Sequence, residues 1–217
     1  MIISHMHPKY RQKRENMAGG KYNGAFYYSR EIVKNIIPNV ETDRNWITIN
    51  IKGCGADHAI VFIHNNLHPE NYEWMKKYKD LVLICGVPDT CRKVQHLGKP
   101  IYLPISIDME YIKQFQIPKK DKTKDAAFAG RKSKKRGLEL PKGIDYLEGL
   151  PRERLLPKMA EYRTIYAVGR TAIEARALGC IVKPYDPRYP DPELWQVLDN
   201  REAAHMLQIH LNMLDKQ

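Results

Sequence analysis

The stretch from residue 164 to residue 184 constrains the fold of this 217-residue chain most strongly. Its apolar run at 165–168 is typical of a short buried strand, and Gly169 breaks that run. A helix rich in small residues follows from Arg170, Gly179 ends it, and a second apolar run begins at Cys180. These signals predict a strand, a tight turn, a helix and a second strand, which together form one βαβ unit.

Two features of this unit exceed what packing alone requires. The turn places backbone N–H groups and the Thr171 hydroxyl at a helix N-terminus, where anions bind readily. One turn further along, Glu174 introduces a carboxylate into an otherwise apolar helix. The unit therefore predicts an anion-binding turn with a carboxylate beside it.

Apolar runs alternate with helical patterns along the rest of the chain. Strands are predicted at 2–3, 46–51, 59–63, 80–85, 99–104, 126–129 and 144–147, and helices at 22–37, 69–79, 90–98, 152–162 and from about 200 to the end. Such alternation is typical of mostly parallel sheets that helices cover on both faces. The predicted fold class is α/β, with two Rossmann-like lobes.

The polar, basic and proline-containing segment 116–124 predicts a linker between these lobes. We place a trimmed N-terminal lobe at 1–115 and a C-terminal lobe at 116–217. The final helix is amphipathic, and we expect it to pack back on the first lobe.

The net charge of +11 is unevenly distributed, with one cluster of basic residues at 9–14 and a denser one at 119–136. Such clusters attract polyanions or phosphorylated small molecules. A solvated basic loop without a dedicated ligand is the alternative.

Several kinds of protein are disfavoured by the composition. No apolar run approaches the roughly 20 residues that span a bilayer, and the N-terminus is too short and polar for a signal peptide. The four cysteines lack zinc-like spacing, which predicts reduced thiols in a cytoplasmic protein. His64 and His68 have an i, i+4 spacing, but Pro69 indicates a loop, so no metal site is predicted.

Three motifs in the second half resemble, in order, the nucleotide-sugar-binding domain of GT-B fold glycosyltransferases. Phe128-Ala-Gly-Arg131 with Lys134-Lys-Arg-Gly137 is similar to the family's "GR…KG" strand and loop. Residues 147–159 are similar to the next strand, glycine and helix, and Gly169–Glu174 with Ala177-Leu-Gly179 to the donor loop and helix. Leu103–Asp108 resembles the exit of the acceptor domain, so the resemblance covers roughly residues 80 to 185.

The resemblance implies a minimal GT-B-like protein with a nucleotide sugar as co-substrate and no other cofactor. The donor diphosphate and ribose would contact Gly130, Arg131, Lys135, Gly169, Arg170, Thr171 and Glu174. In the family the Arg and Lys hold the diphosphate, and the Glu binds the ribose hydroxyls. The alternatives are a merely solubilising loop at 131–136 and a surface carboxylate at Glu174 that pairs with Arg170 or Lys183.

The chain departs from the family's pattern in two respects. Tyr166 stands eight residues before Glu174, where retaining members carry a first Glu, and the acceptor half is short. An inverting enzyme needs a general base on the acceptor side. Of His64, His68, Asp57 and Asp89, the rule that ligands lie at the carboxyl ends of parallel strands favours His64 and Asp89. A loop histidine and a helix N-cap are the respective alternatives.

The favoured function is transfer of a sugar from a nucleotide-sugar donor. Because the chain is basic, modified DNA is a candidate acceptor, and phage enzymes that glucosylate hydroxymethylated bases share the GT-B architecture. The rival is a non-catalytic protein on the same fold that binds a nucleotide, a nucleotide sugar or nucleic acid.

Overall fold

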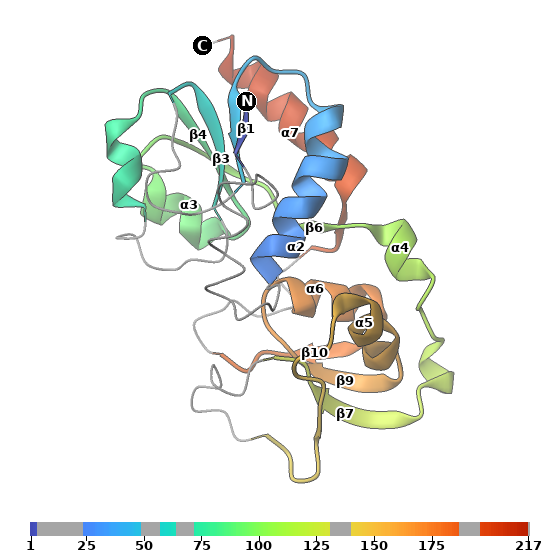
Figure 1. Cartoon of the computed structure of the whole chain (residues 1–217). Helices are drawn as coiled ribbons and strands as arrows, with labels where there is room; N and C mark the ends of the chain where they lie inside the picture. Colours follow the sequence, from blue (N-terminus) through green and yellow to red (C-terminus); the bar gives the residue numbers. More distant parts are fainter. Residues whose placement is uncertain (4–23, 49–56, 64–71, 131–139, 187–195, 217) are drawn as a thin grey trace. The chain divides into compact units, whose positions relative to one another are not determined.

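The computed structural model describes residues 1–3, 24–48, 57–63, 72–130, 140–186 and 196–216 (Figure 1). For residues 24–26 it describes the backbone but not the side chains. The chain divides into two compact units: residues 1–105 with 200–217 form unit 1, and residues 106–199 form unit 2. All of the described strand pairs are parallel. The predicted α/β class with mostly parallel sheets is therefore confirmed.

Unit 1 contains a five-stranded sheet in the order β1-β2-β3-β4-β5. The strands are β1 (Ile2–Ile3), β2 (Asn45–Ile47), β3 (Ala59–Ile63), β4 (Leu81–Cys85) and β5 (Lys99–Tyr102). Every residue of β3 and β4 is buried, as expected for parallel strands with both faces covered.

Alternate side chains of β3 and β4 face two different layers. One set packs with η4 (Glu73–Lys77) and α3 (Pro88–Val94) around Met75 and Val94. On the other face, Phe62 contacts the rings of Tyr28 and Trp46 at centroid distances of 6.3 and 6.2 Å. This second layer comprises α2 (Gly24–Glu31), η1 (Ile32–Ile36), η2 (Ile37–Asn39) and α7 (Asn200–Leu214).

Unit 2 contains a four-stranded sheet in the order β10-β9-β7-β8 and a two-stranded sheet. The first comprises β7 (Lys124–Phe128), β8 (Asp145–Tyr146), β9 (Tyr162–Tyr166) and β10 (Ile181–Lys183), and the second β6 (Ser106–Ile107) and β11 (Leu198–Asp199). Its helices are α4 (Met109–Lys113), η5 (Lys119–Asp121), α5 (Arg152–Ala160) and α6 (Arg170–Ala177). The predicted βαβ unit is confirmed as β9-α6-β10, and α5 and α6 pack against each other and on β9 (Figure 1).

The segment predicted as a linker, 116–124, is instead an ordered part of unit 2. It contains η5 and the first residue of β7, and Lys122 is only 2% exposed. The Lys122 ammonium donates to the carbonyls of Ala160 and Leu178 at 2.7 and 3.2 Å, at the C-terminal ends of α5 and α6. A cation at two helix C-termini is favourable, which explains why this polar segment is held in place.

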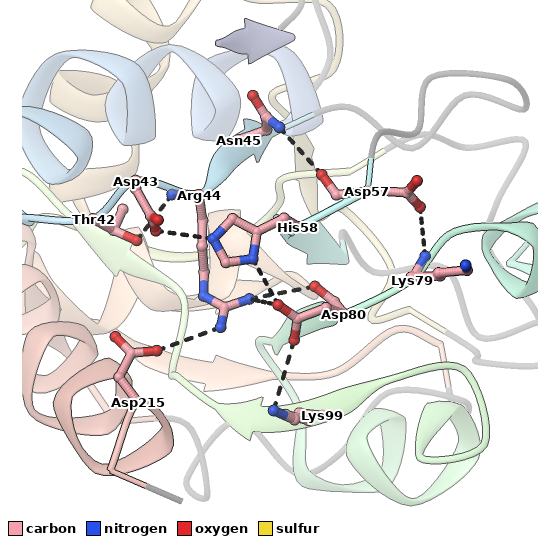
Figure 2. Close-up of polar contacts among 10 residues, drawn as sticks. All are labelled: Thr42, Asp43, Arg44, Asn45, Asp57, His58, Lys79, Asp80, Lys99 and Asp215. Atoms are coloured by element: carbon pink, nitrogen blue, oxygen red, sulfur yellow. Dashed lines mark hydrogen bonds and ion pairs between the residues drawn. The ribbon is translucent and has the colours of Figure 1, made fainter.

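A network of charged side chains lies at the amino ends of the unit 1 strands, and we call it the His58 cluster (Figure 2). His58 Nδ1 is 2.6 Å from Asp80 Oδ2, and His58 Nε2 is 2.9 Å from Asp43 Oδ1. Arg44 donates to Asp80 at 2.8 Å and to Asp215, beyond the end of α7, at 3.4 Å. Lys99 Nζ completes the cluster at 3.6 Å from Asp80.

Among the described helices, none is long and apolar enough to cross a membrane.

Candidate functional site

The candidate site lies where the strand connections of unit 2 diverge. β7 lies between β8 and β9, and the chain leads from β7 to β8 on one side but from β9 to β10 on the other. The Ala129 amide donates to the Tyr166 carbonyl at 3.0 Å, so the carboxyl ends of β7 and β9 are adjacent. Ligands of open α/β sheets bind outside the carboxyl ends of the strands at such a switch point.

The turn from β9 into α6 depends on Gly169. This residue has φ 63° and ψ −143°, a conformation that residues with a Cβ atom rarely adopt. Its carbonyl accepts hydrogen bonds from the amides of Ala172 and Ile173 at 3.0 and 3.3 Å. Helix α6 therefore begins at Arg170, and its first N–H groups and positive dipole end lie at the switch point.

Glu174 joins two arginines inside unit 2, and we call these residues the Glu174 cluster. Glu174 is buried, with its side chain 4% exposed, and Oε1 accepts hydrogen bonds from Arg170 Nε and Arg152 Nε, both at 2.9 Å. Arg152 is the first residue of α5, and its guanidinium lies 5.2 Å from the centroid of the Tyr111 ring in α4. Guanidiniums bind phosphate oxygens in a bidentate manner, so the residue types of this cluster are compatible with an anionic ligand.

Gly130 lies beyond the end of β7, and its lack of a side chain has a packing reason. An added Cβ would approach the Tyr185 ring to 2.6 Å. Tyr185 in turn packs on Phe128 with a centroid distance of 4.9 Å. The glycine of the "GR" motif therefore lets the Tyr185 ring pack directly against the backbone of Gly130.

The structure brings together five of the residues predicted for the donor site at this edge: Gly130, Gly169, Arg170, Thr171 and Glu174. Thr171 is half-buried in the first turn of α6. Arg131 and Lys135 lie outside the described residues, as does His64. The pairing of Glu174 with Arg170 that we considered as the alternative is present, but the pair is buried rather than on the surface.

Asp89 lies in the first turn of α3, at the carboxyl edge of the unit 1 sheet. It does not cap that helix, because the N-cap residue is Val87. Its carboxylate pairs with Lys93 at 2.5 Å and Arg92 at 3.2 Å, and the hydrogen bond from Lys93 lowers the pKa of Asp89. A carboxylate with a lowered pKa is a weaker general base.

Asp57, the weaker candidate that the carboxyl-end rule did not favour, lies at the amino edge of the unit 1 sheet. It precedes β3, at the amino ends of the strands, where its carboxylate accepts the Lys79 amide at 2.6 Å (Figure 2). This position argues against a role on the ligand-binding edge of the sheet.

Tyr166, which stands eight residues before Glu174, belongs to the core of unit 2. It is 8% exposed and packs in one cluster with Phe128 and Tyr185. Its place is therefore explained by packing.

Sequence analysis did not identify Arg152 as a site residue. Its contact with Glu174 joins positions 22 residues apart, and Arg154 follows in the same helix. The one available signal is its position as the first residue of a helix that follows Pro151.

Comparison with known proteins identifies no relative: no family model matches the chain, and no curated protein matches its sequence. Within the described part of the chain, no group of three or more His, Cys, Asp or Glu side chains could hold a metal ion.

Proposed function

We propose that unit 2 binds a nucleotide sugar through its diphosphate and that the chain transfers the sugar to an acceptor, with modified DNA as one candidate. The observation that carries the proposal is the position of the α6 N-terminus together with the Glu174 cluster at the switch point of the unit 2 sheet. The resemblance of the 128–137 and 169–179 segments to GT-B donor motifs supports the same ligand.

The proposed chemistry needs stabilisation of the leaving diphosphate, on which negative charge builds in the transition state. Helix N–H groups and arginines can supply it, because guanidiniums bind phosphate oxygens in a bidentate manner. In this proposal Arg170 and Arg152 contact the phosphates, together with Arg131 and Lys135. Glu174 contacts the ribose hydroxyls, as the resemblance implies, and also holds both guanidiniums in position.

Two observations favour the rival function, a non-catalytic binder. The position of the first Glu of retaining relatives is occupied by the buried Tyr166. The carboxylate of Asp89 is paired with two cations of its own helix. Neither position therefore offers an available catalytic carboxylate.

A panel of nucleotides and nucleotide sugars tests the proposal and separates it from its rival. The full-length protein is titrated with UDP, GDP and ADP and their sugars by thermal shift, and donor hydrolysis is followed by NMR. Stabilisation with turnover supports the transferase, whereas stabilisation without turnover supports the binder. If no nucleotide stabilises the protein, the transferase and a binder of nucleotides or nucleotide sugars are both wrong, and only the nucleic-acid-binding form of the rival remains.

Arg152→Lys tests the site itself, since it keeps the charge but loses the planar, bidentate donor geometry. We expect about tenfold weaker nucleotide binding, which corresponds to about 1.4 kcal/mol. The matched control is Arg163→Lys in the same unit, because Arg163 is exposed and pairs with the exposed Asp125 of β7. Equal effects of the two substitutions would remove the Glu174 cluster from the proposed site.

A further inference from the structure

Helix α7 carries apolar side chains on two opposite faces. One face, which contains Leu207, is buried and packs on η1 and η2 of unit 1 (Figure 1). The opposite face contains Met206, which is half-buried, and Ile209 and Met213, which are 46% and 59% exposed. A surface helix ordinarily has polar residues on its outward face, whereas a helix that is apolar all round is buried. The outward face of α7 therefore has the composition of an interface.

Contacts within unit 1 fix the rotation of α7 about its own axis. Four side chains of the inward face are at most 2% exposed: Ala203, Ala204, Leu207 and Leu211. On the flank of the helix, Gln208 Oε1 accepts the Glu41 amide at 2.6 Å, and Gln208 Nε2 donates to the Glu41 carbonyl at 3.2 Å. The outward face is therefore presented in one defined orientation.

We call the outward face the α7 stripe, and its members are Glu202, His205, Met206, Ile209, Asn212, Met213 and Lys216. Apolar side chains occupy the middle of the stripe, and charged side chains of opposite sign occupy its ends. Glu202 lies seven residues before Ile209, and Lys216 lies seven residues after it. A repeat of seven residues with an apolar seam is the spacing at which two helices pack against each other.

We propose that the α7 stripe binds a second copy of this chain, with the two α7 helices antiparallel about a twofold axis at Ile209. Residues at equal distances from the axis then face each other, so Glu202 of each copy faces Lys216 of the partner subunit. A parallel pair would instead place like charges together at both ends of the stripe. The charges therefore make the stripe complementary to itself only in the antiparallel orientation.

The size of the stripe predicts a weak dimer. A helix of 15 residues is about 22 Å long and about 10 Å wide with its side chains, so one face offers less than the roughly 800 Å² that each partner of a standard interface buries. Methionine, which supplies two of the three apolar side chains, is enriched at interfaces. Monomer and dimer should therefore exchange, with a dissociation constant in the micromolar range.

Sedimentation velocity of the full-length protein from micromolar to millimolar concentrations tests the proposal. We expect the average mass to rise with concentration from that of one chain toward that of two. Ile209→Lys should weaken association at least about tenfold, because it places a charge at the centre of the interface on both copies. The urea midpoint of the monomer should be retained, since Ile209 is partly exposed.

Ile181→Lys is the matched control, because Ile181 is an isoleucine on β10 of unit 2 that is 61% exposed. This substitution removes the same apolar side chain from another surface and should leave association unchanged. The proposal is overturned if the wild type stays monomeric throughout the concentration range. It is equally overturned if the two substitutions weaken association to the same extent.

Charge reversal tests the antiparallel orientation. Glu202→Lys and Lys216→Glu should each weaken association several-fold, because each places like charges together at both ends of the stripe, and high salt should reduce the difference. The variant that carries both substitutions should associate as the wild type does, since opposite charges again face each other. If the effects of the two substitutions simply add in this variant, the antiparallel pairing is wrong.

Discussion

The two charged clusters of this protein lie at opposite edges of their sheets and differ in their exposure to solvent. The His58 cluster lies at the amino ends of the unit 1 strands, where the side chains of His58, Asp80 and Asp215 are 43%, 37% and 59% exposed. The Glu174 cluster lies at the carboxyl ends of the unit 2 strands, where Arg152, Arg170 and Glu174 are 13%, 7% and 4% exposed. The carboxylates and the imidazole of the first cluster are partly solvated, whereas all three side chains of the second cluster are largely buried.

This difference separates a stabilising arrangement from a candidate binding one. Ion pairs of partly exposed side chains contribute little to stability, so we expect the contacts of His58 and Asp215 in the His58 cluster to add only modestly to it. Breaking a buried ion pair by removing one partner is costly, and the Glu174 cluster lies at the edge where α/β sheets bind ligands. The comparison predicts that substitutions in the Glu174 cluster have much larger effects than those in the His58 cluster.

The largest expected effect is that of Glu174→Ala. Removal of the carboxylate leaves two largely buried guanidiniums without their shared acceptor, which should lower the free energy of unfolding by about 3–5 kcal/mol. Urea denaturation measures the loss, and hydrogen exchange of the β7 and β9 amides localises it to unit 2.

The matched control in the same unit is Asp125→Ala. Asp125 pairs with Arg163 at 2.7 Å, but their side chains are 89% and 57% exposed. The control should lose less than about 1 kcal/mol. If Glu174→Ala were as mild as the control, the two guanidiniums would be solvated and the comparison between the clusters would fail.

A second, smaller loss is expected for Gly169→Ala. An alanine at φ 63° and ψ −143° is strained, which should destabilise unit 2 by about 1–3 kcal/mol. The substitution also displaces the first N–H groups of α6, so stabilisation of the protein by nucleotides should be lost. Thermal unfolding with and without nucleotide measures both effects.

Gly179→Ala is the control, because it introduces backbone strain at the C-terminal end of α6 instead of the N-terminal end. Gly179 ends the same helix at φ 75°, and an added Cβ there would meet no atom within 4 Å. The Gly179→Ala variant should lose about 1–2 kcal/mol of unfolding free energy, yet nucleotides should still stabilise it. Loss of that response in both variants would mean that helix stability, rather than the α6 N-terminus, controls binding.

Much of the fold could be predicted from the apolar pattern. The run at 59–63 coincides with β3, and the predicted 80–85 strand differs from β4 by one residue. The helices were less predictable, because their ends depend on tertiary contacts. The helix predicted for 22–37 changes into a π-helix at Ile32, and the one predicted for 90–98 ends at Val94.

The candidate site could be predicted only as far as local signals extend. Gly169, Arg170 and Glu174 are close in the sequence, so the turn and its carboxylate are visible there. Arg152 reaches Glu174 only because α5 packs on α6, and no local pattern encodes that contact. The His58 cluster was not predicted either, since it joins residues from 43 to 215.

The pH dependence of stability is expected to reflect the His58 cluster. Hydrogen bonds with Asp43 and Asp80 raise the pKa of His58 above its ordinary value of 6.5, and the hydrogen bond from His58 lowers the pKa of Asp80 below 3.8. A raised pKa stabilises the folded state below pH 6.5, and this contribution is lost as the pH rises through the folded-state pKa. The contribution of Asp80 is present above pH 3.8 and is lost as the pH falls through its lowered pKa.

His58→Asn tests this assignment, because Asn tolerates the positive φ of 52° at this position. Urea midpoints of the wild type should decline on the alkaline side of pH 6.5, and this decline should be absent in the variant. High salt should weaken the effect, since the side chains are partly exposed. The same alkaline decline in wild type and variant would assign it to another group.

The smallest expected effect is that of Asp215→Asn. The ion pair of Asp215 with Arg44 is long, at 3.4 Å, and its carboxylate is 59% exposed. Asp215 also follows the C-terminal end of α7, where the helix dipole disfavours a negative charge. This repulsion offsets part of the attraction between Asp215 and Arg44. Arg44 keeps its shorter contact with Asp80 in the variant. The free energy of unfolding should therefore change by less than about 0.5 kcal/mol in urea denaturation, and a loss above about 1 kcal/mol would show that this pair anchors α7.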